Sequence, residues 1–373
     1  MPAKNVLHLG VKELWSLARD PGMLVLIAYA FSLSIYAVAT GLPDTLHKAS
    51  IAIVDEDQSP LSQRIVNAFQ PPLFLPPKLV SREEMDARMD SGVDTFALDI
   101  RPKFQQDVLA GRSPAIQLNT DATRVSQAFS GSSYVQTIVL GEVQTWLQRY
   151  RSTFQPPVDI EERVRFNPNL SRFWFGAVVA MIDMTTLLSV LLTGAALIRE
   201  RERGTVEHLL VMPVTPFEIM TSKVWSMGLV VLVASALCMT CIVEGALGVP
   251  INGSRWLFLC GTALHIIAVT SLGMFLATFA RTMPQFALLM ILVLLPLQML
   301  SGGMTPRESM PQFVQDIMLA APTTHFVMLA QGILFRGADL SAVWPSFLAL
   351  AVIGATLFGV ALARFRKTIG QMA

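Results

Sequence analysis

Six runs of almost uninterrupted apolar residues alternate with polar segments along the chain. They cover residues 22–40, 173–198, 223–245, 255–280, 282–304 and 341–363. A helix needs about 20 apolar residues to cross the roughly 30 Å hydrocarbon layer of a membrane, and each run is close to that length or longer. The pattern therefore predicts an α-helical membrane protein with six transmembrane helices, the first of them an uncleaved anchor.

One long polar segment, residues 41–172, separates the first two apolar runs. It holds 16 of the acidic and 14 of the basic residues, or 30 of the 55 charges in the chain. Short alternating stretches predict strands at 50–54, 95–100 and 115–119. Helices are expected from Pro60 to Phe69 after an N-cap at Ser59, from a capping box at Ser81, and over 124–151. We therefore expect an inserted α/β domain that faces away from the cytoplasm.

The basic residues predict the orientation in the membrane. They gather in residues 1–21, in the 199–222 loop, at Arg281 and in the 364–373 tail, whereas the loops on the opposite side hold few. Both termini and the 199–222 loop are thus expected to be cytoplasmic. Residues 1–21 have one apolar helical face and are expected to lie along the cytoplasmic interface. Residues 305–340 are expected to form re-entrant or amphipathic helices on the outer side.

The 199–222 loop opens with an ordered motif. Alternating charges are followed by a possible helix break and cap and by apolar residues that a short loop has no core to bury. The motif residues are Arg199, Glu200, Arg201, Glu202, Gly204, Thr205, Glu207, Leu209, Leu210 and Pro213. The combination favours a docking element for a cytoplasmic partner. The alternative is a solvated charged loop that only fixes the topology.

This motif resembles the Glu-Arg/Lys-Glu-x-Gly-Thr-x-Glu-x-Leu run of ABC-2 type transporter permeases. Two further matches follow the same order: Asn167-Pro168 before the second run, and Ser301-Gly302 with Pro306 after the fifth. The resemblance covers essentially the whole chain. It is closest to the multidrug-efflux-like branch of Gram-negative inner membranes, which carries a large periplasmic domain after the first span.

The resemblance implies the membrane half of an ATP-driven exporter of the type V kind. Such a permease works with a second copy or a sibling permease and moves a drug-like or amphiphilic substrate out of the cytoplasm or the inner membrane. The motif loop would sit on a separate cytoplasmic ABC ATPase, with Glu200, Glu202 and Glu207 as charged contacts and Leu209 and Leu210 as apolar anchors. The periplasmic domain would hold a membrane-fusion-type adaptor.

The chain itself has no means of holding nucleotide. No Gly-x-x-x-x-Gly-Lys-Ser/Thr run occurs in it. We therefore expect no enzymatic activity and no directly bound cofactor, with ATP and Mg²⁺ on the partner ATPase. Membrane lipids are further partners, and no nucleic-acid partner is expected.

Asp183 and His265 lie deep in the second and fourth runs. A charge there costs roughly 2.5–3.5 kcal/mol on insertion scales, so a cavity or a polar partner is expected. Hydrogen bonds from Thr185 or Thr186 to Asp183, and a helix–helix bond for His265, are one interpretation. A substrate path is the other. Two alternative functions stay open: a proton-coupled carrier that uses Asp183 and His265, and a non-transporting membrane sensor or scaffold.

Two further clusters have structural interpretations. Asp55-Glu56-Asp57 is expected to be a strand-to-helix turn, since no histidine lies near it and no regular spacing of acids follows. Cys238-x-x-Cys241 lies inside an apolar helix and is expected to be a pair of small residues. No metal site is predicted.

Overall fold

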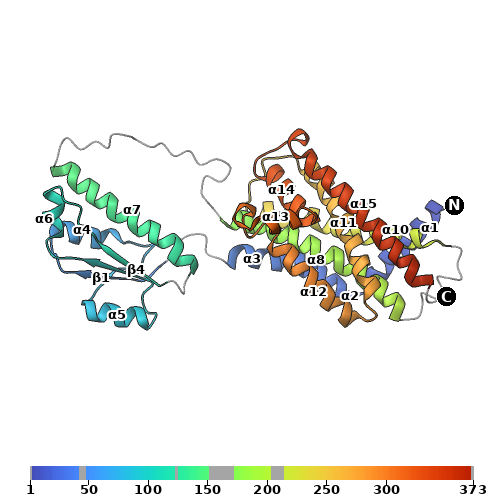
Figure 1. Cartoon of the computed structure of the whole chain (residues 1–373), viewed down its shortest axis with the longest axis horizontal. Coiled ribbons are helices and arrows are strands. Elements are labelled where there is room, and N and C mark those ends of the chain that lie inside the picture. The colour runs from blue at the N-terminus through green and yellow to red at the C-terminus, as the bar shows by residue number, and fades with distance from the viewer. Residues whose placement is uncertain (1, 42–47, 122–124, 151–171, 203–213, 371–373) are drawn as a thin grey trace. The chain divides into compact units, whose positions relative to one another are not determined.

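The computed structural model describes residues 2–41, 48–121, 125–150, 172–202 and 214–370. The chain forms two compact units, Met1–Leu42 with Val164–Ala373, and Pro43–Arg163. The first unit is helical and the second contains a β-sheet (Figure 1). Each unit packs around hydrophobic clusters of its own.

The helical unit begins with α1 (Pro2–Ala18). The next apolar segment joins α2 (Pro21–Tyr29), a π-helical stretch (Ala30–Ser34) and α3 (Ile35–Gly41). Its other helices are α8 (Arg172–Glu202), α10 (Pro216–Cys238) with a π-helical extension (Met239–Ala246), α11 (Arg255–Phe279), α12 (Met283–Met299), α13 (Gln312–Met318), α14 (Pro322–Leu334) and α15 (Leu340–Gly370).

Within the described ranges, five helical segments are long and apolar enough to cross a membrane. These are Pro21–Gly41, Phe173–Glu202, Pro216–Ala246, Arg255–Phe279 and Leu340–Lys367. The pair α13 and α14 would add a sixth as a broken span, but it bends by 90° and equally suits a re-entrant loop. The described chain is thus a helical membrane protein with five or six candidate spans.

The span expected at 282–304 is shorter than the sequence pattern indicates. Helix α12 has 17 residues. At 1.5 Å per residue it is about 25 Å long, against a hydrocarbon layer of about 30 Å. Its end is set by the Ser301-Gly302 turn, where Gly302 adopts φ +93 and the Ser301 hydroxyl donates to the Gln298 carbonyl at 2.8 Å. The apolar run continues past the helix, so hydropathy alone overestimated its length.

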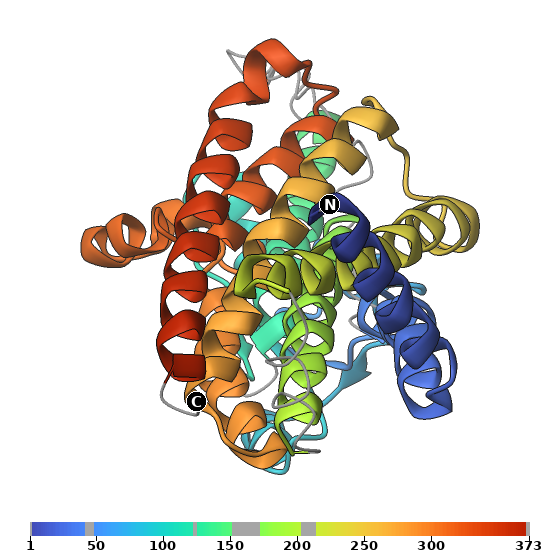
Figure 2. The same ribbon diagram turned by 90° about the vertical axis from the view of Figure 1, so that its right-hand side faces the viewer.

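Helix α11 lies at the centre of the helical unit, in contact with α8, α10, α14 and α15 (Figure 2). Gly273 brings it close to α8: a Cβ atom there would lie 2.6 Å from the Val190 carbonyl oxygen and 2.7 Å from Thr193 Oγ1. Buried hydroxyls on α8 donate to carbonyls of their own helix, as Thr193 Oγ1 does to Ser189 O at 2.6 Å. Small residues, and hydroxyls that bond carbonyls of their own helix, thus let these helices approach closely without large apolar side chains between them.

The second unit contains a four-stranded sheet in the order β2-β1-β3-β4. The strands are β1 (Ile51–Asp55), β2 (Lys78–Leu79), β3 (Phe96–Ile100) and β4 (Gln117–Thr120). β1 pairs in parallel with β2 and β3, and β4 is antiparallel to β3. The helices are α4 (Pro60–Ala68), α5 (Arg82–Asp90), α6 (Phe104–Leu109) and α7 (Val125–Tyr150).

Helices cover both faces of this sheet. One face packs Ile53, Phe96 and Leu98 against α4, α6 and α7. The opposite face packs Ala52, Val54 and Ala97 against Met85 of α5. The fold of this unit is therefore α/β, with its larger core on the side of α7.

Most of the predicted elements of this unit are confirmed. The strands and the helices that begin at Pro60, Arg82 and Val125 lie within two residues of the expected bounds. Ser59 caps α4 and Ser81 caps α5 through the Glu84 amide at 3.2 Å. Two elements were missed, β2 and α6. A strand of two residues is too short to show alternation of apolar and polar positions, and a helix of six residues is too short for a helical hydrophobic period to be recognised.

The tight α8–α11 contact predicts the effect of adding a methyl group. Gly273→Ala is expected to lower the free energy of unfolding by about 1–3 kcal/mol, since the Cβ would meet backbone atoms of α8. The control is Gly176→Ala on α8, where nothing lies within 4 Å of the added atom. Thermal unfolding of both variants in mild detergent checks this, and equal melting temperatures would contradict the packing argument.

Candidate functional site

The charged end of α8 is bound to other parts of its own chain. Glu200 Oε2 lies 2.8 Å from Lys223 Nζ of α10, and the same ammonium lies 2.8 Å from Glu13 Oε1 of α1. Lys12 Nζ of α1 adds a contact of 3.5 Å to Glu200 Oε1. We call Lys12, Glu13, Glu200 and Lys223 the ion-pair cluster. It joins three helices with two positive and two negative charges.

Burial makes the cluster energetically sensitive. The Lys223 side chain is 1% exposed and Glu13 is 10% exposed, whereas Lys12 is 59% exposed. A buried charge that loses its partner is costly, so Lys223 requires its two carboxylates. Burial alone would raise the pKa of Glu13, but the charge and hydrogen bond of Lys223 outweigh it, and the pKa lies below its ordinary value.

Arg199 makes a second link to the N-terminal helices. Its Nη1 atom donates to Asp20 Oδ2 at 2.9 Å. Asp20 is also the N-cap of α2, where Oδ1 accepts from the Met23 amide at 3.2 Å. The Asp20 carboxylate therefore caps the start of α2 and also binds the connection between α1 and α2 to α8.

Arg201 and Glu202 bind the connection between α11 and α12. Arg201 Nη1 donates to the Ala280 carbonyl at 2.6 Å, and Glu202 Oε1 accepts from the Met283 amide at 2.9 Å. Met283 is the first residue of α12, so the Glu202 carboxylate meets the positive end of that helix. The charged part of the motif thus holds α1, α2, α10 and α12 around the end of α8.

The rest of the motif lies outside the described residues: Gly204, Thr205, Glu207, Leu209, Leu210 and Pro213. The chain resumes at Val214, and α10 starts with a capping box in which Thr215 and Glu218 bind each other's amides. The described segments on both sides of 203–213 are therefore firmly held. Contact of Glu200 and Glu202 with an ATPase stays a prediction, and their observed partners belong to this chain.

Sequence reasoning missed the partners in this site. Glu13 and Asp20 received no role, and Lys223 counted only among the basic residues that predict the orientation in the membrane. Glu13 shares one buried face of α1 with Gly10 and Leu17, so an acid at helical spacing from small and apolar residues is a signal that could have identified the cluster. Its partner could not be read from sequence, because Lys223 lies 210 residues further along the chain.

His265 forms the expected helix–helix hydrogen bond. Its Nε2 atom lies 2.8 Å from Thr186 Oγ1 of α8. The ring is fully buried and stacks on Phe326 of α14, with centroids 4.3 Å apart and planes 9° from parallel. These contacts give His265 a packing role between three helices.

Asp183 is arranged differently from the expectation. Thr185 and Thr186 donate to the Met181 and Ile182 carbonyls, at 2.7 and 2.9 Å, instead of to Asp183. The Asp183 side chain is half-buried, and no hydrogen bond or ion pair joins its carboxylate to a residue in the described ranges. Its own carbonyl accepts from Gln298 of α12 at 3.1 Å. It is thus a polar group on the α8 face beside α12.

The other motif residues fall in two groups. Asn167 and Pro168 lie outside the described part of the chain. Ser301 and Gly302 form the turn that ends α12, and Pro306 precedes a 3₁₀ turn. The next residue, Gly303, packs against α8, where a Cβ atom would lie 2.9 Å from a methyl group of Val179. Gly303 is not a motif residue, but its packing holds the turn close to α8.

The acidic cluster after β1 is the expected turn. Asp55 Oδ1 accepts from the Asp57 and Gln58 amides at 3.1 and 2.9 Å, and Asp57 Oδ2 accepts from the Gln105 amide at 3.0 Å. Among the residues that the structure describes, no group of three or more His, Cys, Asp or Glu could hold a metal ion. Cys238 and Cys241 are both free thiols.

The cluster predicts unequal effects for its two lysines. Lys223→Met leaves two carboxylates buried without their cation and is expected to cost about 3–5 kcal/mol of unfolding free energy. Lys12→Met removes a mostly exposed partner and is expected to cost about 0–1 kcal/mol. Chemical unfolding of both variants in micelles measures the difference, and a cost for Lys223→Met as small as that for Lys12→Met would show that the cluster does not stabilise the fold.

Glu13 predicts a pH dependence. Because its folded-state pKa is depressed, its charge stabilises the protein above the unfolded-state pKa of about 4.3, and this stability is lost as the pH falls through the lower folded-state value. The stability advantage of the parent protein over Glu13→Gln is thus expected to be constant at neutral pH and to vanish under acid conditions. Melting temperatures across pH measure it. A gap that widens on acidification would contradict the assignment.

Comparison with known proteins agrees with this architecture. Residues 22–363 match the family described as ABC-2 family transporter protein. The chain is 61% identical over 370 residues to the inner membrane transport permease YhhJ of Escherichia coli, covering 99% of both proteins. It is 29% identical to the probable multidrug ABC transporter permease YbhR of the same organism, covering 96% of this chain and 97% of that protein. The chain therefore belongs to the ABC-2 family of transporter permeases and is a multi-pass protein of the inner membrane.

Proposed function

We propose that this permease is the membrane-spanning subunit of an ATP-driven exporter and has no enzymatic activity of its own. ATP and Mg²⁺ would be bound by a separate cytoplasmic ABC ATPase, as the family implies in general. The motif loop that follows α8 would rest on that ATPase. The termini and this loop would then be cytoplasmic, as the distribution of basic residues also predicts.

The observation that carries this proposal is the set of contacts made by the charged end of α8. Glu200 binds Lys223 of α10, and Glu202 binds the first amide of α12. A force on the loop between α8 and α10 would therefore reach α8, α10 and α12 through short charged contacts. This arrangement suits a loop that transmits movement of a partner into the membrane helices.

The Glu200 and Glu202 contacts change the expected division of roles. Since both carboxylates already bind this chain, they would hold the loop in position. Leu209 and Leu210 would then supply most of the contact with the ATPase, because apolar surface buried at the centre of an interface contributes most of the binding energy. Glu207 would add a charged contact at its rim.

The transported substrate is proposed to be drug-like or amphiphilic, in keeping with the multidrug wording in the names of two relatives. Asp183 is the residue we assign to the substrate path. It is half-buried on α8, and its carboxylate has no partner among the described residues. His265 is assigned to packing, because its ring bonds Thr186 and stacks on Phe326.

Two further partners complete the proposal. A second permease, identical or a sibling, would enclose the pathway together with this chain. The α/β unit would lie in the periplasm and hold an adaptor of the membrane-fusion type. Its size supports a binding role, because a unit of this length with its own core exceeds what a connection between two spans needs.

The docking role of the loop predicts a selective loss of ATPase. The permease is purified from membranes in nanodiscs, and hydrolysis of Mg-ATP by co-purifying protein is measured. Leu209→Ala with Leu210→Ala is expected to reduce that activity by about tenfold or more, since burial of each leucine is worth roughly 1.5–3 kcal/mol.

The matched control is Leu288→Ala with Leu292→Ala on α12, where both side chains are 70% exposed on the helical unit. This pair is expected to leave co-purifying ATPase unchanged. Equal activity in both double variants would reject the docking assignment. Flux from permease that carries no ATPase would instead favour the proton-coupled carrier and make Asp183→Asn the next variant.

A further inference from the structure

Strand β4 lies at one edge of the sheet, with half of its backbone groups directed outward. The Asp121 amide donates to the Thr95 carbonyl at 2.9 Å, which fixes the phase of the antiparallel β3–β4 pair. Pairing groups alternate along a strand, so Asn119 and Gln117 also face β3. The N–H and C=O groups of Leu118 and Thr120 therefore point away from the sheet.

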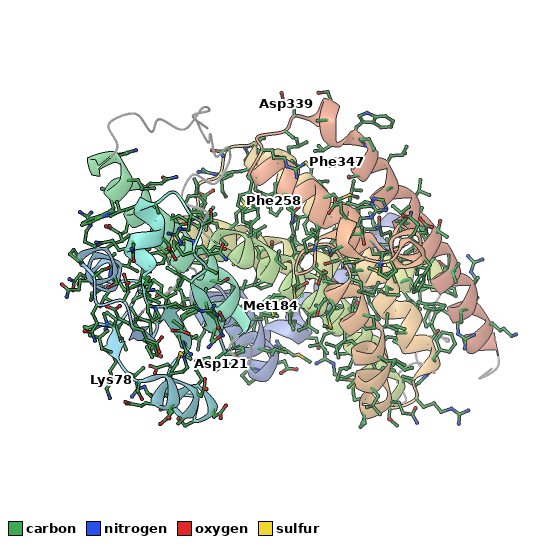
Figure 3. The ribbon with its side chains drawn as sticks, turned by 60° about the vertical axis from the view of Figure 1, so that its left-hand side comes forward. Lys78, Asp121, Met184, Phe258, Asp339 and Phe347 are labelled. Atoms are coloured by element: carbon green, nitrogen blue, oxygen red, sulfur yellow. The ribbon has the colours of Figure 1, made fainter. Side chains whose placement is uncertain are left out.

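The two edges of the sheet differ in how they are protected. β2 has only two residues, begins with Lys78 and follows Pro76-Pro77, features that discourage pairing with another strand. β4 has four residues and contains neither proline nor a charge. Within the described ranges, no backbone hydrogen bond joins the Leu118 or Thr120 amide to a residue beyond the edge. Figure 3 labels one residue at each edge of the sheet: Lys78 of β2, and Asp121, which directly follows β4.

An apolar cleft opens beside β4 on the sheet face that carries α7. Its volume is about 580 Å³. Leu118 of β4 lines it together with Val108 of α6 and Val139 and Val143 of α7. Apolar side chains that approached along the edge could enter this cleft and leave water.

A polar hollow of about 440 Å³ lies on the other face, beside the first turns of α5. Gln117 and Asn119 of β4 line it. Acids exceed bases by one among its charged residues, which are Glu56, Asp86, Asp99, Arg82 and Arg101. Asp99 is 3% exposed, and its Oδ2 atom accepts from Arg82 at 2.9 Å. Its Oδ1 atom is buried and has no hydrogen-bond partner within the described residues. This carboxylate oxygen can accept a hydrogen bond from a donor such as a basic side chain.

We propose that the open edge of β4 binds an extended segment of a partner protein as a fifth strand. Side chains of an added strand alternate between the two faces of a sheet. In this strand they would be apolar toward the α7 cleft and basic toward the Asp99 hollow. Hydrogen bonds to the Leu118 and Thr120 backbone would supply affinity for the added strand. The apolar cleft and the polar hollow would select a strand in which apolar and basic side chains alternate.

A second copy of β4 does not suit this site. β4 has one apolar side chain, Leu118, and it already lines the cleft of its own sheet. A second copy would bring the amides of Gln117 and Asn119 to the Asp99 side and no basic group. A different protein with alternating apolar and basic residues matches both hollows.

This inference rests on the proposed binding role of the α/β unit and specifies how the partner is held. Its test is independent of transport and of the ATPase. The full-length permease in nanodiscs is titrated into a fluorescent peptide of about eight residues with alternating valine and arginine, close to a common strand length. A peptide of the same composition in scrambled order is the control ligand. We expect saturable binding of the alternating peptide and at least tenfold weaker binding of the scrambled one.

Thr120→Pro removes an outward N–H without touching the ladder to β3, and proline is tolerated on edge strands with that orientation. The substitution is expected to reduce the affinity for the alternating peptide about tenfold, which corresponds to the loss of one or two hydrogen bonds. The matched control is Leu79→Pro. The Val80 amide donates to Ile53 O at 3.1 Å, so the Leu79 amide also points outward, from the opposite edge. Leu79→Pro should leave affinity unchanged.

Two further measurements keep the test decisive if Thr120→Pro misfolds. N-methylation of alternate peptide residues should abolish binding to the unaltered permease, and Asp99→Asn should reduce the preference for arginine over glutamine in the peptide. Equal affinity for the scrambled or N-methylated peptide would overturn the inference. So would Thr120→Pro dissociating permease dimers while no peptide binds, because the edge would then pair with a second copy.

Discussion

The contact between Lys223 and its two carboxylates is the constraint on which the charged end of the helical unit depends. The ammonium is almost fully buried, and Glu13 and Glu200 each approach it to 2.8 Å. Removal of the ammonium would leave both carboxylates without compensation, so the shared contact holds α1, α8 and α10 together. The Asp20 and Met283 contacts extend the same constraint to α2 and α12. Three neighbouring sets of contacts at the end of α8 therefore hold five helices together.

Polar groups within the apolar part of the unit follow a similar rule. The hydroxyls of Thr185, Ser189 and Thr193 bond carbonyls of their own helix. His265 bonds Thr186 across to α8. Polar side chains can be retained in a low-dielectric region when each has such a partner. The Thr221 and Thr324 hydroxyls have no such partner among the described residues. The Asp183 carboxylate has none either, and because it is the ionisable group of the three it is the one we propose for the substrate path.

The sequence predicted features that depend on local pattern. Long apolar runs, the caps at Ser59 and Ser81, three of the four strands and the turn at Asp55 follow from neighbours a few residues apart. Features that depend on distant partners were not predictable. Arg199 and Asp20 are 179 residues apart, and Lys223 and Glu13 are 210 apart. The length of α12 was also missed, since its end is set by the turn at Gly302 and not by hydropathy.

The distance along the chain between Glu13 and Lys223 has a consequence for biogenesis. Ribosomes add roughly 5–20 residues per second, so the 210 intervening residues take about 10–40 s to synthesise. During that time Glu13 has no Lys223 to neutralise it, and α1 must wait at the aqueous surface of the membrane. The N-terminal helices can lock onto the bundle only after the third long apolar segment has begun to emerge. The ion-pair cluster therefore forms late, although Glu13 is among the first residues to be synthesised.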